Sequence, residues 1–561
     1  MNRPRSWYPH FWVWTLGILS CVDSSFAETR PDTTQQDSVR PAVPDFVVIT
    51  DRWRDIQPSP SEFTVEGHWY DPYNQNVLKG DYPIIGQNTF LIFTASVDNF
   101  VEAVRTPTPS GVSTLDPGSR LTFGNGNRLL VNENLKLGIE LYGGETAFRP
   151  RDWELKVTAF FNLNYANLKE NNGVNIDVRK GKDRTETHVA FQELSLEKHL
   201  FNVSDRYDFV SLKAGIQRFT SDFRGFVFAD FNLGARLFGN LASNRLQWNL
   251  IYLPMIEKET NSELNTVFDK REQDVLIGNL YIQDFLTPGY TTQFSIHYDN
   301  DKPSTHYDEN GFPVRPALVG RTREHEINAY YVGWAGDGHL GGLNITHAFY
   351  QVFGSDSFNP FANRDITLNA QMAALELSMD DDWMRFKVSG FYASGDSDPE
   401  DDVGKGFDAI VDQPFFAGGP FSYWNSQRIG LQGVGLVQKS SFLPSLRSSK
   451  TEGQANFVNP GLLLANIGYD AEISQKLKAI LNVNYLRFMN TAVLQTFLNQ
   501  PRIHKQIGLD YSLGVIYRPF LNNNAIFTLG IAALSPMAGF KDIYETSDVQ
   551  FSSFASLVFT Y

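Results

Sequence analysis

Lysine and arginine side chains recur in segments of this 561-residue chain where charged and apolar residues alternate. A guanidinium group binds a carboxylate through two parallel hydrogen bonds, and a lysine ammonium attracts anions as a point charge. Brought to one water-filled surface, such side chains would select anionic solutes. The cationic candidates are Lys136, Lys156, Lys213, Arg236, Arg385, Lys387 and Arg518, of which the three arginines are the preferred carboxylate binders.

Acidic residues follow the same alternation and leave a second interpretation open. Opposite charges attract strongly where water is scarce, so these acids could pair with the cations and merely fill the space between the segments. Selective binding and mutual pairing are equally consistent with the sequence. The acidic candidates are Glu140, Glu154, Glu193, Glu197, Asp230 and Asp510.

A dense acidic run occupies residues 396–402. The carboxylates of Asp396, Asp398, Asp401 and Asp402 could hold Ca²⁺, which favours oxygen ligands, although the spacing does not match an EF-hand loop. A solvated surface loop explains the run more simply. This calcium ion is the only cofactor that the sequence suggests.

Catalytic chemistry finds no support in the sequence. Serines and histidines are present, but no nucleophile motif surrounds any serine, so we expect no enzyme. The net charge of −15 argues against a nucleic-acid partner, which would require a basic surface. The histidines that could serve as a catalytic base include His188, His297, His325, His347 and His504.

The elements that carry these charges have the period-two pattern of β-strands. Leu135, Leu137, Ile139 and Leu141 alternate with polar residues and glycine, and residues 153–167 and 506–519 show the same pattern. Eighteen strands are predicted by this pattern. They are 88–98, 132–143, 153–167, 188–198, 209–218, 224–238, 245–254, 275–286, 290–299, 325–336, 340–353, 366–380, 383–395, 461–473, 477–488, 506–519, 525–534 and 549–561.

The connections between these strands fall into two classes. Gaps after even-numbered strands are short, as at 287–289, 337–339, 474–476 and 521–524, whereas gaps after odd-numbered strands are longer, as at 255–274, 300–324, 396–460 and 489–505. Outer-membrane barrels have short periplasmic turns and long extracellular loops. The sequence therefore predicts an all-β fold, an antiparallel transmembrane barrel over residues 88–561 in a bacterial outer membrane.

Both ends of the chain fit a secreted barrel. Residues 1–27 have the charged start, short apolar core and small-residue cleavage site of a signal peptide. Residues 28–87 read as a periplasmic lead, whose aromatic part from residue 46 could form a small plug. The final strand is amphipathic and ends in Tyr561, like the signal that barrel assembly machinery reads. Lipid and lipopolysaccharide are the other expected partners.

Two stretches resemble the alginate export family of outer-membrane porins. One is the phrase Tyr392 to Pro399 with Gly406-Phe407-Asp408, and the other is the hairpin Val210 to Phe238. The resemblance implies an eighteen-stranded barrel that exports an anionic polysaccharide, in agreement with the strand count obtained from spacing. The aromatic segment 46–87 is not part of that family pattern.

We therefore expect a channel that passes polar, anionic saccharide-like solutes through its lumen. The alternative is a scaffold or adhesin that acts through its long external loops, above all 396–460. Closure of the lumen discriminates between them, since a plugged barrel with all its charges paired favours the scaffold, and an open charge-lined path favours the channel.

Overall fold

The computed structural model describes residues 68–70, 76–106, 124–144, 150–206, 208–431 and 434–561. The predicted signal peptide, and most of the predicted lead and plug, lie outside these residues. Within the described ranges, no helix is both long enough and apolar enough to cross a bilayer.

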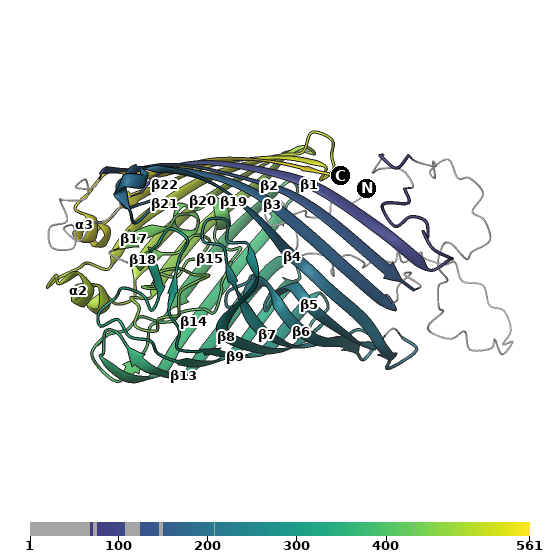
Figure 1. Cartoon of the computed structure of the whole chain (residues 1–561), viewed down its shortest axis with the longest axis horizontal. Helices are drawn as coiled ribbons and strands as arrows, with labels where there is room; N and C mark the ends of the chain where they lie inside the picture. The colour runs from purple at the N-terminus through teal and green to yellow at the C-terminus, as the bar shows by residue number, and fades with distance from the viewer. Residues whose placement is uncertain (1–67, 71–75, 107–123, 145–149, 207, 432–433) are drawn as a thin grey trace.

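Eighteen long strands of the described chain form one antiparallel wall (Figure 1). Their bounds agree with the predicted ones to within a few residues at most ends. They are β1 (Thr89–Arg105), β2 (Gly124–Gly143), β3 (Trp153–Glu170), β4 (Asp183–Asn202), β5 (Phe209–Thr220), β6 (Ala229–Leu241), β7 (Leu246–Lys258), β8 (Asn265–Ile282), β9 (Tyr290–Asp301), β12 (Ile327–Leu340), β13 (Leu343–Asn359), β14 (Arg364–Asp381), β15 (Met384–Ala393), β19 (Leu462–Ser474), β20 (Leu477–Phe488), β21 (Gln506–Tyr517), β22 (Ala525–Pro536) and β23 (Gln550–Thr560).

The wall closes into a barrel. Each long strand pairs with its neighbours in the chain, and β1 pairs with β23 from Ser96↔Thr560 to Arg105↔Phe551. Closure satisfies the backbone groups between strands and leaves no open edge, which a bilayer core requires. The two-residue strand β16 (Val403–Gly404) pairs with β14 but is not one of the eighteen strands that close the ring. The predicted fold class and strand count are confirmed.

The outer wall of the barrel is apolar. Leu135 and Ile139 on β2, Val388 on β15, and Ile467 on β19 all expose their side chains. Residues between them in the sequence, such as Lys136, point to the other face because successive side chains of a strand alternate. A closed barrel with an apolar outside and a polar inside is the architecture of outer-membrane barrels, so the predicted location is confirmed.

Short turns and long loops lie at opposite ends of the barrel. The turn end holds the connections 203–208, 242–245, 341–342, 382–383 and 475–476. The loop end holds 171–182, 221–228, 259–264, 302–326, 394–461, 489–505 and 537–549. The start of β1 and the end of β23 both lie at the turn end, as an even strand count requires. This sorting identifies the turn end as periplasmic.

Several predicted boundaries were wrong: β1 and β2, for example, extend to Arg105 and from Gly124, beyond the predicted 98 and 132. Three further errors concern a turn, a loop and a segment that leaves the wall. The predicted turn 337–339 lies inside β12, and Gly341, whose φ is +64°, makes the turn with Gly342 instead. The predicted loop 255–274 is mostly strand, because β7 and β8 continue until Lys258 reaches Asn265 (2.6 Å). Residues 224–228 belong to a loop that turns into the barrel rather than to β6.

Small elements complete the loop end. The hairpin of β10 (His306–Tyr307) and β11 (Pro313–Arg315) lies within 302–326, and η3 (Val178–Lys180) within 171–182. Helices α2 (Ala492–Leu498) and α3 (Ala538–Tyr544) follow β20 and β22. Loop 394–461 contains η4 (Gly419–Phe421), α1 (Tyr423–Ser426), β17 (Ile429–Leu431) and β18 (Val434–Val437).

Candidate functional site: the barrel lumen

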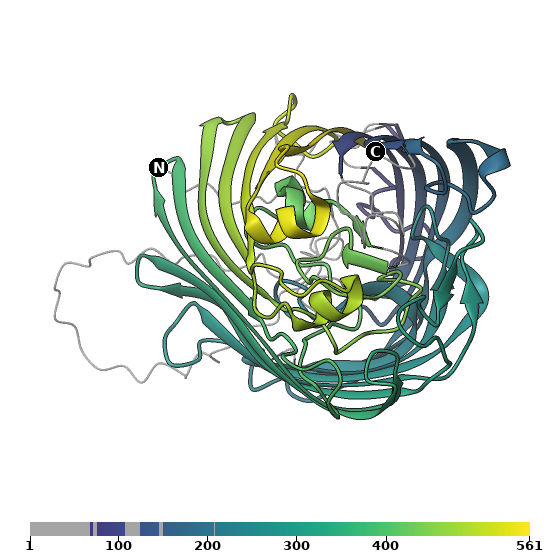
Figure 2. The ribbon, with the colours of Figure 1, turned by 90° about the vertical axis from the view of Figure 1, so that its left-hand side faces the viewer.

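The long loop 394–461 folds into the barrel, and we call it the constriction loop. Viewed from the loop end, its coils and short helices lie inside the ring of strands (Figure 2). Phe421 packs against Ile480, Ile516 and Ile526 on β20, β21 and β22. Across the lumen, Tyr331 on β12 donates a hydrogen bond to the Asp408 carbonyl (3.2 Å). The loop therefore reaches walls on different sides of the barrel.

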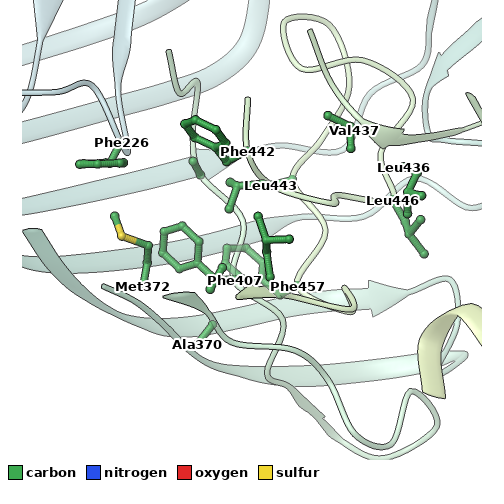
Figure 3. Packing of buried hydrophobic residues seen from close by; sticks show 14 of the residues in the cluster. Phe226, Ala370, Met372, Phe407, Leu436, Val437, Phe442, Leu443, Leu446 and Phe457 are labelled. Atoms are coloured by element: carbon green, nitrogen blue, oxygen red, sulfur yellow. The ribbon is translucent and has the colours of Figure 1, made fainter. Parts of the chain in front are cut away.

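A hydrophobic core inside the barrel holds this loop. Phe407, Phe442, Leu446 and Phe457 of the loop are almost fully buried and cluster with Met372 on the inner face of β14 (Figure 3). Burying an apolar side chain of this size contributes about 1.5–3 kcal/mol. The inner faces of β7, β8, β12, β13 and β14 supply further members of the cluster, including Ile251, Val275, Ala329, Val352 and Leu368. The constriction loop thus packs against an apolar surface on one side of the lumen.

A second loop, 221–228, also turns inward and joins the first. The Asp222 carboxylate accepts hydrogen bonds from the backbone N–H groups of Arg224 (2.8 Å) and Gly225 (2.6 Å) and from the Tyr350 hydroxyl (2.8 Å). The turn so formed pairs with the constriction loop, because the Phe415 N–H donates to the Arg224 carbonyl at 3.1 Å. The two loops therefore contact each other inside the lumen.

The wall formed by β1 to β5 is polar, and the predicted cations on it are paired. Lys136 contacts Asp98 at 3.1 Å. Lys156 contacts Glu193 at 3.0 Å. Lys213 contacts two of the predicted acids, Glu154 at 3.2 Å and Glu197 at 3.3 Å, and Arg151 pairs with Glu140 and Glu154. On this wall the charges neutralise one another, which was one of the two interpretations left open by the sequence.

Uncharged amides lie beyond these ion pairs on the same wall, toward the loop end. Asn162 donates to the side-chain oxygens of Asn132 (2.6 Å) and Asn134 (2.9 Å), and Asn164 donates to Asn162 (2.9 Å). A similar group lies on β19 and β20, where Asn466 donates to Asn484 at 2.7 Å. Amides offer both donors and acceptors, which suits hydroxylated solutes as well as ions.

Three predicted lining residues support the structure. Arg236 donates to the Asn249 side chain (2.7 Å) and lies over the Phe238 ring. Asp230 pairs with the buried Lys258 at 2.8 Å. Asp510 is fully buried, where it receives hydrogen bonds from the start of α1. These side chains position walls and loops, whereas their predicted role was to contact solute.

A hollow beneath the constriction loop brings other cations together. It lies between residues 415–421 of the loop and the walls of β14, β15, β19 and β20. Four cationic side chains and two carboxylates line it, so its formal charge is positive. The cations are Arg224, Arg385, Lys387 and Lys478, and the acids are Glu376 and Asp470.

Each cation of this hollow contacts a carboxylate, but only two of these acids, Glu376 and Asp470, belong to the lining. Lys387 contacts Asp470 at 2.6 Å. Lys478 contacts Glu472, outside the lining, at 2.9 Å and lies 3.8 Å from Asp470. Arg224 contacts Glu376 at 3.2 Å. Asp380, outside the hollow lining, pairs with Arg385. Of the predicted candidates, Arg385 and Lys387 belong to this site.

Sequence reasoning missed Arg224 and Lys478. Lys478 shares its strand face with Asn482 and Asn484, so the alternation of β20 carried a signal for it. Arg224 lies in a loop, where no periodicity could reveal it. Arg518, a predicted candidate, follows β21 at the turn end and does not line this hollow; its Nε and Nη2 have no hydrogen-bond partner in the described chain.

The acidic run takes part in local turns. Asp396 is buried and accepts from the backbone N–H groups of Asp398 (2.9 Å) and Lys405 (3.0 Å), while Asp401 contacts the Lys405 ammonium (2.7 Å). Burial raises the pKa of the Asp396 carboxyl to about 6. Among the described residues, the three carboxylates that converge closely enough for a metal ion are Glu186, Glu259 and Glu309, outside this run. Calcium binding at 396–402 stays a prediction.

Comparisons with known proteins give structural neighbours only. No family model matches the chain. No curated protein matches it either. Similar solved structures include OccK9 (OpdG) of Pseudomonas aeruginosa, with a TM-score of 0.44 and 10% identity, covering 84% of this chain and 98% of that one. OccAB4 of Acinetobacter baumannii has a TM-score of 0.45 and 10% identity, with the same coverage.

A third neighbour is a BenF-like porin from Pseudomonas fluorescens Pf-5, with a TM-score of 0.44, 9% identity and coverage of 84% of this chain and 98% of that one. Similarity at this level carries no argument about solute or mechanism. The resemblance to the alginate export family stays a prediction.

Proposed function

We propose that the protein is an outer-membrane channel that passes small polar solutes and prefers anions, with saccharide acids as the favoured class. The observation that carries this proposal is the hollow beneath the constriction loop, where four cationic side chains face two carboxylates. Rings of arginine and lysine in a pore favour anions. The amides on the polar walls supply hydrogen bonds for hydroxyl groups on the same solute.

The geometry supports a route along the polar walls. The constriction loop packs on apolar residues of the inner faces of β7, β8, β12, β13 and β14, whereas ion pairs and amides cover β1 to β5 and β19 to β20. A charged solute would lose hydration without compensation on the apolar side. The polar walls and the hollow therefore provide the favourable path.

Single-channel recording in planar bilayers tests the proposal. The mature chain should conduct, select anions over cations, and be blocked in a dose-dependent manner by short uronate oligomers. The double variant Arg385→Gln/Lys387→Gln should lose anion preference and bind the oligomers more weakly. The control is Lys136→Gln, which removes a cation already paired on the opposite wall. Equal block of both variants by the oligomers would show that the hollow does not bind them.

Two observations favour the scaffold alternative. Much of the lumen is filled by a packed apolar core, and the charges on the wall of β1 to β5 are paired. Correctly folded protein that fails to conduct, even after deletion of residues 28–87, would exclude the channel. The external loops would then be the place to search for a binding partner.

A further inference from the structure

The hairpin β10–β11 crosses part of the external mouth. Its turn contacts loops that belong to distant strands, since β4 to β8 separate β3 from β9 in the ring. The Ile176 N–H in loop 171–182 donates to the Asn310 carbonyl (3.2 Å). In loop 259–264, Asn261 accepts from the Asn310 amide (3.0 Å) and Thr260 accepts from the Glu309 N–H (3.1 Å). The hairpin is thus fastened at its far end.

The base of the hairpin holds the constriction loop through a buried arginine. Arg315 on β11 pairs with Glu257 on β7 and donates to the Glu452 carbonyl of the constriction loop at 2.7 Å. The Ser448 hydroxyl donates to the Val314 carbonyl beside it. Arg315 therefore connects the hairpin, the barrel wall and the constriction loop in one place.

A second buried arginine, on the barrel wall, forms hydrogen bonds with the same part of the constriction loop. Arg271 on β8 donates to the carbonyl oxygens of Thr451 and Gly453, the latter at 2.9 Å, and contacts Asp301 at 3.3 Å. Gln454 donates to the His325 carbonyl at 3.1 Å, where loop 302–326 returns to β12. Residues 448–454 are consequently clamped between the hairpin and the wall.

The two sides of this clamp differ in their own stability. The wall side is part of a closed barrel, whereas the hairpin has strands of only two and three residues. A hairpin this short is marginal without its docking contacts. Segments with little buried apolar area open at lower free energy than core elements. The hairpin is therefore the part of the clamp that can open while the barrel stays folded.

We propose that the hairpin β10–β11 is a strap that keeps the constriction loop in its narrow position, and that lifting the strap widens the path through the lumen. This inference rests on the proposed channel function. It assigns to an external loop the control of a constriction inside the barrel, through Arg315 and residues 448–454.

Arg315→Gln in the full chain tests this coupling. The variant removes the ion pair to Glu257 and weakens the hold on the Glu452 carbonyl. It should have a higher mean single-channel conductance than the wild type, with more frequent transitions. Tyr307→Ser is the matched control, because this exposed side chain lies on the same hairpin. The control should conduct like the wild type.

A second variant covers the case in which Arg315→Gln fails to fold. Replacing residues 303–324 by a short Gly-Ser linker removes the strap but leaves β9 and β12 intact. Barrel formation is checked by heat-modifiable migration in detergent gels. The variant should conduct more than the wild type. Wild-type conductance from a correctly formed barrel without its strap would overturn the inference.

A separate readout distinguishes failure of the inference from failure of the channel. If the wild type does not conduct at all, the proposed function fails, and the coupling is then judged by proteolysis. Loss of the strap should increase cleavage within residues 440–457. Unchanged protection of that segment would overturn the coupling whatever the conductance.

Discussion

The carboxylate of Asp510 on β21 accepts a hydrogen bond from the backbone N–H of Trp424 at 3.0 Å. The N–H of Tyr423 (3.2 Å) and the hydroxyl of Ser422 (3.0 Å) donate to the same carboxylate. A carboxylate at the start of a helix satisfies N–H groups that have no partner within the helix. Asp510 thereby fixes α1, and with it the middle of the constriction loop, to the barrel wall.

Asp510→Ala should loosen the constriction loop without opening the barrel. Three buried donors would lose their acceptor, and each unsatisfied donor costs about 1–3 kcal/mol. We expect faster proteolysis within residues 415–430 and noisier single-channel currents, with unchanged heat-modifiable migration. Asp510→Asn keeps one acceptor oxygen and should have a smaller effect. Wild-type protection of the loop in Asp510→Ala would contradict the anchoring role.

Gly514 lies on β21, four residues after Asp510, and the Phe421 ring packs against it. Substitution of this glycine should therefore be poorly tolerated. A Cβ at this glycine would lie 2.5 Å from the Phe421 ring. Gly514→Val should displace the ring and destabilise the loop by about 1–3 kcal/mol, as overpacking does. Gly390→Val on β15 is the control, since nothing lies within 4 Å of its Cβ position. Hydrogen exchange of residues 419–426 should be faster in the first variant only; equal exchange would argue against this contact.

The barrel could be predicted because its physical cause is local. Alternating side chains, a bilayer outside and water inside impose period two on each strand, and the sorting of turns and loops follows from insertion. The prediction failed where residues leave the wall for the lumen. Residues 224–228 carry strand-like side chains, yet Asp222 turns them inward by binding their backbone.

The site was less predictable because it depends on distances between strands. The alternation in the sequence predicted that Lys136 and Lys387 both face the water-filled lumen as cations available to a solute. In the structure, Lys136 pairs with Asp98 on the wall of β1 to β5, whereas Lys387 pairs with Asp470 in a hollow whose lining holds four cations and two acids. Alternation gives the face of a side chain and not its partner across the barrel. The position of the constriction loop, which creates the hollow, has no periodic signal at all.

Tyr561 should have two roles. Its aromatic ring should help the assembly machinery to recognise the final strand, and its contacts with Lys79 and Asn76 should stabilise the closed barrel. Lys79 lies 3.9 Å from the centroid of this ring, and Asn76 donates to the hydroxyl at 3.1 Å. Tyr561→Phe should assemble normally, because an aromatic end is kept for the assembly machinery. Tyr561→Ser should lower the fraction of heat-modifiable protein in the outer membrane.

Lys79→Gln separates these two roles of Tyr561. It removes a cation–π contact of about 0.5–1 kcal/mol and leaves the chain end unchanged. Normal assembly with slightly lower thermal stability is expected. Equal assembly of Tyr561→Ser and the wild type would contradict recognition of the final strand.

Glu309 should make docking of the strap depend on pH. Its carboxyl lies within 4.8 Å of those of Glu259 and Glu186. Partial burial, a hydrogen bond with Glu259 and the surrounding carboxylates raise the pKa of Glu309 to about 7. The nearest cation on β4 is Arg184, which contacts Glu186 at 3.7 Å. At neutral pH, three carboxylates therefore compete for one guanidinium.

The sign of the effect follows from the raised pKa of Glu309. An undocked glutamate titrates near its ordinary value of about 4.3. The docked hairpin thus binds more protons between that value and about 7, and its docking weakens as pH rises through this window. Other charged groups at this contact, Asp308, Glu452, His306 and Arg428, lie on the hairpin and the constriction loop.

Proteolysis of the hairpin between pH 5 and pH 8 measures this dependence. Cleavage within residues 303–315, corrected for protease activity, should be faster at the higher pH. Glu309→Gln keeps a neutral donor for Glu259 and should hold the strap closed across the range. Glu324→Gln, an exposed carboxyl on the same loop, is the control and should behave like the wild type. Because the strap holds residues 448–454, the wild-type channel should conduct more at pH 8 than at pH 5. A pH response that survives in Glu309→Gln would contradict the role of Glu309.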